Sequence, residues 1–360
     1  MALDIAGVER QASLLAAFRD GKKAALARAI SVVENHRAGF DVLLAELHPL
    51  IGRARRIGVT GPPGAGKSTL ATCLARTYRD AGLTVGIVCV DPTSPFTGGA
   101  LLGDRIRMEE IALDPGVYIR SLATRGSLGG LSAATRETCD VLDAFGIDRI
   151  LIETVGVGQS ELDVARTADS SVVVLVPESG DSIQTLKAGL MEIADIFAVN
   201  KADRPGADRL RNEIELMLGM RAGAQHGDAP AHHGVDLSRN NLLKQVREAV
   251  RNDGERWTPP VLRTVASQGE GITELADALD RHFRYLEGSG ALRERRRTRL
   301  RERVADVVDE RIRRRLWTDA ETTAWLDERL PDLEAGTATP FGIADALLAR
   351  SADLLTGRTS

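Results

Sequence analysis

The chain has 360 residues, of which 43% are hydrophobic and 27% are charged, and its formal net charge is −4. This composition is ordinary for a soluble globular protein, and the length allows one large α/β domain with additions. Because the net charge gives no general attraction to nucleic acids or membranes, we expect neither as a partner. The N-terminal segment contains Asp4 and Glu9 and lacks the basic and then apolar regions of a signal peptide, so we expect a cytoplasmic protein.

Residues 1–50 have the apolar periodicity of helices. Apolar side chains recur every three or four residues between Leu14 and Ile30, and the stripe continues from Asp41 to Leu47. This spacing places the apolar side chains on one face of each helix. We therefore predict an N-terminal helical segment that precedes the main domain.

From Arg56 onward, seven short β-branched runs alternate with segments of helical length. These runs cover residues 56–60, 84–91, 117–122, 149–154, 171–177, 196–200 and 261–266. Such alternation predicts an α/β fold in which a mostly parallel sheet is flanked by helices. We expect this domain to span residues 51–286 and helices to occupy residues 287–360. Ligands of such sheets bind beyond the carboxyl ends of the strands.

A glycine-rich run, GPPGAGKST, joins the first predicted strand to a helix predicted to begin at Thr69. The spacing of Gly61, Gly66 and Lys67 lets successive backbone N–H groups point at a phosphate, with the positive end of the helix behind them. Lys67 can then reach the outer phosphates of a nucleotide, and Ser68 can bind Mg²⁺. The residues predicted to contact the nucleotide here are Gly61, Pro62, Pro63, Gly64, Ala65, Gly66, Lys67, Ser68 and Thr69.

Two carboxylates, Asp91 and Glu153, lie at the ends of predicted buried strands. A carboxylate in that position is costly unless it meets Mg²⁺, a water molecule on Mg²⁺ or a hydroxyl group. The Gly-, Pro-, Ser- and Thr-rich segment 92–108 is predicted to be a switch, in which Asp104 is either a further magnesium ligand or the cap of the following helix. The predicted magnesium ligands are Ser68, Asp91, Asp104 and Glu153.

Gly156 follows Glu153 closely in the sequence. There its N–H can donate to a γ-phosphate, and the segment can swing when that phosphate leaves, as in a second switch. Catalysis by such a site is positional and electrostatic. We therefore predict that Lys67, Asp91 and Glu153 have catalytic roles.

The sixth predicted strand ends in the run Asn-Lys-Ala-Asp. The carboxylate of Asp203 can accept hydrogen bonds from N1 and N2 of guanine, a donor pair that adenine lacks. Asn200 can bond the base edge and support the loop, and the stem of Lys201 can cover the ring. After the last strand, backbone N–H groups of the run Ala266, Ser267 and Gln268 can bond the guanine carbonyl. The site is therefore predicted to bind GTP.

Three other features have alternative interpretations. His226, His232 and His233 could form a metal site, but the surrounding Gly, Ala and Pro favour a surface loop. The arginine-rich stretch 293–315 could contact nucleic acid, but it also carries acids and an apolar stripe, which favour a docking helix with a solvated face. That stripe consists of Leu300, Val304, Val308, Ile312 and Leu316. The separated Cys73, Cys89 and Cys139 are expected to be buried small side chains.

Taken together, several runs resemble the methylmalonyl-CoA mutase-associated GTPases, the MeaB family once labelled ArgK. They are GPPGAGKST, VDPTSPFTGGALLGDRIRM, TRGSLGGLS, ETVGVGQSE, GDSIQTLKAGLMEIAD, NKAD and WTPPVL. The resemblance runs from about Ala25 to the C-terminus. It implies a P-loop NTPase fold and a homodimeric GTPase that acts as a chaperone for an adenosylcobalamin-dependent acyl-CoA mutase, in cofactor loading, protection and reactivation.

The resemblance also implies roles for two further segments. Pro177 to Lys187 would be a third switch that faces the mutase, with Lys187 in a catalytic role, and the C-terminal helices would form the dimerisation arm. Mg²⁺ is the expected cofactor, and we expect no cobalamin to be bound tightly by this chain.

Two other functions are alternatives to this interpretation. One is a kinase that acts on a small molecule or a protein, as the ArgK label suggests; it should need an acceptor pocket and usually prefers ATP, which the guanine-type run 200–203 disfavours. The other is a nickel-delivery GTPase, which needs a metal site built from Cys and His. The cysteines here have no paired spacing.

Overall fold

A computed structural model describes residues 5–91, 108–123, 133–154, 160–177, 188–225 and 256–351. The chain divides into two compact units, Met1–Leu292 and Arg293–Ser360, and each is described by itself. The boundaries expected after residues 50 and 286 stay predictions. In the part of the chain that the structure describes, no helix is long and apolar enough to cross a membrane.

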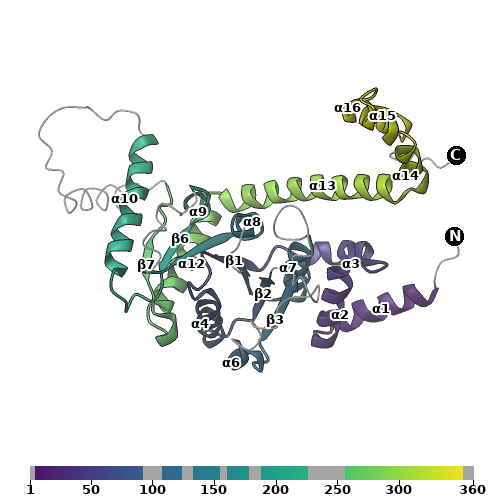
Figure 1. The fold of residues 1–360 in the computed structure, drawn as a ribbon. Coiled ribbons are helices and arrows are strands. Elements are labelled where there is room, and N and C mark those ends of the chain that lie inside the picture. Colours follow the sequence, from purple (N-terminus) through teal and green to yellow (C-terminus); the bar gives the residue numbers. More distant parts are fainter. Residues whose placement is uncertain are drawn as a thin grey trace, which may run out of the picture. The chain divides into compact units, whose positions relative to one another are not determined.

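The first unit contains one seven-stranded parallel sheet in the order β3-β2-β4-β1-β5-β6-β7 (Figure 1). The strands are β1 (Arg55–Thr60), β2 (Val85–Asp91), β3 (Val117–Ala123), β4 (Arg149–Thr154), β5 (Ser170–Leu175), β6 (Ile196–Val199) and β7 (Val261–Arg263). All seven predicted runs are therefore strands of a single sheet. The last is shorter than predicted, because the chain turns after Arg263 into a 3₁₀ helix and a bridge between Val265 and Glu270.

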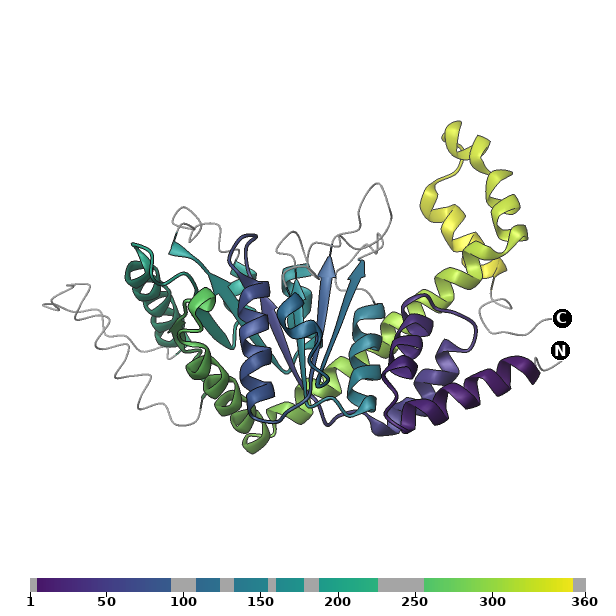
Figure 2. The ribbon, with the colours of Figure 1, turned by 90° about the horizontal axis from the view of Figure 1, so that it is seen from below.

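Helices cover both faces of this sheet, and Figure 2 shows the strands side by side between them. The first unit contains α1 (Ile5–Arg19), α2 (Lys23–Glu34), α3 (Phe40–Leu47), the 3₁₀ helix η1 (His48–Leu50), α4 (Lys67–Asp80), α6 (Glu109–Ala112), α7 (Ala133–Phe145), α8 (Ser160–Thr167), α9 (Ala188–Ile193), α10 (Ala207–Gln225), the 3₁₀ helix η3 (Ala266–Gln268) and α12 (Ile272–Gly288). The predicted fold class is confirmed by this arrangement.

Strand β1 shows how the two faces are divided. Because successive side chains of a strand point to opposite faces, Ile57 and Val59 join the core formed with α4 and α12, while Gly58 faces α8. A Cβ atom on Gly58 would lie 2.6 Å from a methyl group of Val164, so α8 packs directly on the strand backbone.

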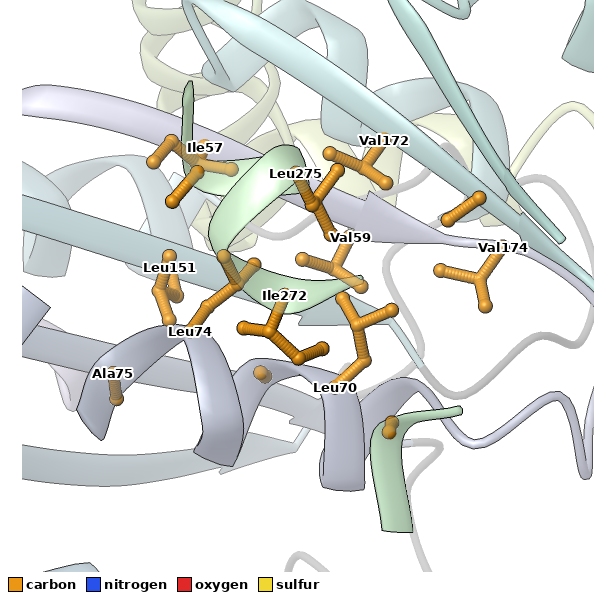
Figure 3. Packing of buried hydrophobic residues seen from close by; sticks show 14 of the residues in the cluster. Ile57, Val59, Leu70, Leu74, Ala75, Leu151, Val172, Val174, Ile272 and Leu275 are labelled. Carbon is orange, nitrogen blue, oxygen red and sulfur yellow. The ribbon is translucent and has the colours of Figure 1, made fainter. Parts of the chain in front are cut away.

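The core on the α4 face holds both ends of the glycine-rich loop (Figure 3). Ile57 and Val59 precede the loop, and Leu70 and Leu74 follow it on α4. All four side chains are buried, and burial of one such side chain contributes about 1.5–3 kcal/mol. The loop therefore starts and ends on rigidly packed elements.

The N-terminal helices pack on the opposite face, against α7. Phe18 of α1 contacts Phe145 edge-on, with 5.1 Å between ring centroids. The chain that leads into β1 is held by Asp143 of α7, whose carboxylate accepts backbone N–H groups of Gly52 at 2.8 Å and Ala54 at 2.9 Å. Because Asp143 is almost fully buried, these bonds replace its lost hydration.

The second unit is helical, as predicted, with α13 (Ala291–Thr318), α14 (Ala320–Asp327), α15 (Leu330–Glu334) and α16 (Pro340–Arg350). The side chain of Asp319 caps α14 by accepting the N–H of Thr322, and Thr339 caps α16 in the same way. Leu316 of the predicted apolar stripe is buried, but the other four residues of the stripe are exposed.

Candidate nucleotide-binding site

The glycine-rich loop between β1 and α4 has a backbone that requires glycine. Gly61 has φ +135°, and a Cβ atom there would lie 2.1 Å from the carbonyl oxygen of Val174. Gly66 has φ +86° and is the N-cap of α4, where a Cβ atom would lie 2.5 Å from Nδ2 of Asn200. Helix α4 begins at Lys67, two residues before the predicted start at Thr69. Its N-terminus therefore lies directly at the loop, where it favours an anion.

The two charged or polar side chains at the start of α4 are buried. Nζ of Lys67 donates to the carbonyl oxygens of Gly61 and Pro62, each at 2.9 Å. Ser68 Oγ donates to Oε1 of Glu153 at 2.5 Å. The predicted ligands Ser68 and Glu153, which are 85 residues apart in sequence, are thus in direct contact.

These groups fit a magnesium ion, because hydroxyl and carboxylate oxygens are the ligands that Mg²⁺ prefers. Glu153 is only 6% exposed, so its charge needs a donor or a cation nearby. Asp91 ends β2, the strand next to β4, so its backbone reaches the same edge of the sheet as Glu153. The predicted site residues Asp104, Gly156 and Lys187 lie outside the described residues, as does the environment of the Asp91 side chain.

Asn200, at the end of β6, joins three segments that surround the expected nucleotide. Its Nδ2 donates to the carbonyl oxygen of Ala65 in the glycine-rich loop at 2.8 Å. Its Oδ1 accepts bonds from Oγ1 of Thr264 at 3.2 Å and the N–H of Ala266 at 3.1 Å. This is the supporting part of the predicted role of Asn200, and the contact with the base edge stays a prediction.

The predicted base-contacting run 266–268 forms the 3₁₀ helix η3. The thiol of Cys73 on α4 donates to the carbonyl oxygen of Ala266 at 3.1 Å. Burial raises the pKa of Cys73, and the charge of Arg76 opposes this effect only in part. The raised pKa favours the protonated thiol, which is the form that donates. The sequence predicts Cys73 only as a small buried side chain, because nothing in the local pattern indicates a partner so distant along the chain.

A pocket of about 700 Å³ opens beside Asp203, at the end of the sheet formed by β6 and β7. Its lining combines the ends of these strands with the turn before α12: Ala202, Asp203, Leu262, Arg263, Thr264, Val265, Gly269, Glu270, Gly271, Thr273 and Glu274. Arg263 was not among the predicted site residues, although its guanidinium bonds the loop that carries Asp203.

The other candidate metal features give no site within the described part of the chain. No group of three or more His, Cys, Asp or Glu side chains gathers there in a metal-binding arrangement. None of the three cysteines, all of which the structure describes, forms a disulfide; Cys89 and Cys139 are buried and Cys73 is half-buried. The predicted loop with His226, His232 and His233 falls outside the described residues.

Comparison with known proteins decides the family. The family described as methylmalonyl-CoA mutase-associated GTPase MeaB matches residues 26–321. The chain belongs to the MeaB family. The resemblance noted in the sequence is thereby confirmed.

Relatives of the MeaB family support this assignment across most of the chain. A putative GTPase of Pyrococcus horikoshii is 48% identical over 82% of this chain and 84% of its own length. The mouse mitochondrial methylmalonic aciduria type A homolog is 33% identical over 91% of this chain and 76% of its own length. Among solved structures, the chain is similar to a LAO/AO transport system kinase, with 26% sequence identity and a TM-score of 0.63. The match covers 96% of this chain and 98% of the kinase chain.

The family assignment makes this chain a GTPase, an enzyme that hydrolyses GTP to GDP and phosphate. The geometry agrees with that chemistry, because a glycine loop at a helix N-terminus lies against the Asn-Lys-Ala-Asp run through Asn200.

Proposed function

We propose that this site hydrolyses GTP with Mg²⁺ and that hydrolysis is coupled to chaperoning of an adenosylcobalamin-dependent acyl-CoA mutase. The observation that carries the nucleotide part is the bond from Asn200 to Ala65, which joins the phosphate loop to the base loops. In the proposed site, GTP lies along the carboxyl ends of β1, β4 and β6, with its phosphates at the N-terminus of α4.

Lys67 and the backbone N–H groups of residues 64–68 would hold the β- and γ-phosphates, with Lys67 leaving its bonds to Gly61 and Pro62. Ser68, Asp91, Asp104 and Glu153 would hold Mg²⁺ directly or through water. When bound, Mg²⁺ neutralises charge that develops on the phosphates. The buried bond between Ser68 and Glu153 already orients two of these groups toward each other.

Base selectivity would come from Asp203, with Lys201 over the ring and the N–H of Ser267 at the guanine carbonyl. Of the other two residues of the predicted run, the N–H of Ala266 is bonded to Oδ1 of Asn200 and that of Gln268 to the carbonyl oxygen of Val265. Lys201 has a left-handed backbone with φ +55°, which is uncommon for a residue with a side chain. Ala202, between Lys201 and Asp203, is buried, so the loop is bent tightly against the protein.

The mutase part of the proposal is supported by the description of the family and by the name of the mouse relative. We infer that the segment from Pro177 to Lys187, which follows β5, responds to the mutase and brings Lys187 toward the nucleotide. Pro177 lies at the sheet edge where the phosphate loop begins, because β5 pairs directly with β1. A cation delivered there would stabilise charge in the transition state.

Lys187→Ala should therefore lose most of the stimulation of GTP turnover by the mutase. We expect the ratio of stimulated to basal rates to fall by about 1–3 kcal/mol of coupling. The measurement is GTP turnover with and without a saturating adenosylcobalamin-dependent acyl-CoA mutase, with Lys22→Ala, between α1 and α2, as the matched control. Equal stimulation of the Lys187 variant and the control would contradict this role. If the mutase is loaded with adenosylcobalamin at the same rate with and without GTP, the chaperone proposal is contradicted.

We also propose that the chain is a homodimer joined through its C-terminal helices. Four residues of the apolar stripe on α13 are exposed: Leu300 by 48%, Val304 by 64%, Val308 by 46% and Ile312 by 40%. Phe341 on α16 is 83% exposed. An exposed apolar stripe of this kind on α13 favours a protein partner, and the family resemblance favours a second copy.

Val304→Asp should convert such a dimer into monomers, because it would bury an unpaired charge at the interface. Light scattering coupled to size-exclusion chromatography measures the mass directly. Ala305→Asp is the matched control, since it adds the same charge about 100° around the helix. A monomeric parent protein, or a dimer that survives Val304→Asp, would overturn this part of the proposal.

A further inference from the structure

The loop that carries Asp203 is held by the end of the edge strand β7. Two consecutive residues bond the two sides of Ala202. The carbonyl oxygen of Thr264 accepts the N–H of Ala202 at 3.0 Å. Nη2 of Arg263 donates to the carbonyl oxygen of Ala202 at 2.9 Å. Ala202 is therefore bonded at both its donor and its acceptor.

These two bonds fix the position from which the Asp203 side chain starts. Because peptide groups are planar, a bond to the N–H of Ala202 orients the peptide between residues 201 and 202. In the same way, the bond from Arg263 to the carbonyl oxygen orients the peptide between Ala202 and Asp203. The second plane sets the direction of the backbone at Asp203, and thus where its carboxylate can reach.

The loop needs such support because Lys201 has a φ of +55°. A residue with a side chain leaves this region when the surrounding structure does not hold it there. Thr264 supports the loop by a neutral backbone bond, whereas Arg263 supports it by a charge-assisted bond, which is the stronger kind. Loss of Arg263 would therefore let the second peptide plane rotate.

Arg263 is itself held in place by a second partner. Its Nη1 donates to Oδ1 of Asp208, in the first turn of α10, at 2.9 Å. The planar guanidinium thus bridges Ala202 and Asp208 with two different nitrogens, which a lysine ammonium cannot reproduce with the same geometry. The Arg263 side chain is 44% exposed and lines the pocket beside Asp203, so its removal opens no hole in the core.

We propose that Arg263 is a positioning residue that determines base specificity, by orienting Asp203 toward N1 and N2 of guanine. The proposal rests on the proposed recognition of guanine by Asp203. Arg263 acts through the loop: it keeps the Asp203 carboxylate aligned with N1 and N2 of guanine, so that both hydrogen bonds form at the same time. Inosine, which keeps N1–H and lacks the N2 amine, can form only one of these bonds.

The test compares GTP with ITP. In Arg263→Ala, we expect the affinity for GTP to fall on the order of tenfold and the affinity for ITP to fall about twofold, because only GTP uses both bonds. The GTP-to-ITP preference should then drop about fivefold, with KM for GTP raised and kcat at saturating GTP changed less than twofold. Arg263→Lys should recover part of the preference, since an ammonium can still reach the carbonyl oxygen of Ala202.

Asp208→Asn is the matched control, because it removes the exposed counterion and leaves the bond from Arg263 to Ala202. We expect its GTP-to-ITP preference to stay within twofold of the parent. Equal losses for GTP and ITP in Arg263→Ala, or an unchanged preference, would overturn the proposal. Thermal unfolding of each variant identifies a loss of affinity that comes only from destabilisation of the fold. Such a loss would affect GTP and ITP equally and would count against the proposal.

Asp203→Asn separates this inference from the proposed base site. If Asp203→Asn keeps the preference for GTP over xanthosine triphosphate, the base assignment and the role of Arg263 fail together. If Asp203→Asn loses that preference while Arg263→Ala keeps the parent ratio of GTP to ITP, the base assignment stands and only the positioning role fails.

Discussion

Lys67→Ala should lower GTP turnover by on the order of a hundredfold to a thousandfold, the usual cost of removing one group that stabilises transition-state charge. Lys67 lies in the first turn of α4 and is only 5% exposed, so its ammonium can meet a phosphate in a largely water-free position. There its charge is screened little, and alanine offers nothing in its place. Steady-state phosphate release measures the effect.

The fold of this variant should persist. Nζ of Lys67 donates to carbonyl oxygens of the loop, at Gly61 and Pro62, and the packing around the loop comes from β1 and α4. Circular dichroism and thermal unfolding check this point, with Lys22→Ala as the control for a lysine that is 65% exposed. Turnover within about threefold of the parent in a folded Lys67 variant would refute the assigned phosphate site.

Asp203→Asn should change the preferred nucleotide from GTP to xanthosine triphosphate. The carboxylate accepts two donors from guanine, whereas an amide can accept one and must place its own N–H₂ group against the other. Xanthine has a carbonyl where guanine has the amine, so the amide can donate to it. A site that loses both charge and complementarity typically loses a hundredfold or more in affinity for its ligand. We expect a loss of about 3–4 kcal/mol in the free energy of GTP binding.

Competition between the two nucleotides for one labelled guanine nucleotide measures this exchange. Asp208→Asn is a suitable control, because it neutralises an acid only five positions further along, in the first turn of α10. Retained selectivity for GTP in the Asp203 variant would rule out the predicted base contact. A matching change in the Asp208 variant would show that the shift reflects local charge and not recognition.

The local sequence was sufficient to predict the elements of the nucleotide domain. Each of the seven strands is a β-branched run between turn residues, and strand patterns of this kind depend on near neighbours only. The phosphate loop was predictable for the same reason, because its glycines satisfy a backbone requirement within one short segment. The helix after it begins two residues earlier than predicted, since Gly66 provides the N-cap.

The long-range contacts could be seen only in the tertiary structure. Sequence order does not give the strand order β3-β2-β4-β1-β5-β6-β7, because crossover connections do not fix which strands become neighbours: β1 pairs with β4 and β5, although β2 follows it in the chain. The contacts of Asn200 with Ala65, of Cys73 with Ala266 and of Arg263 with Ala202 join residues 61 to 193 positions apart. No sequence-spacing rule predicts contacts over such separations. The residue types of this site were therefore predictable from local motifs, whereas their hydrogen-bond partners depend on how the sheet brings the strand ends together.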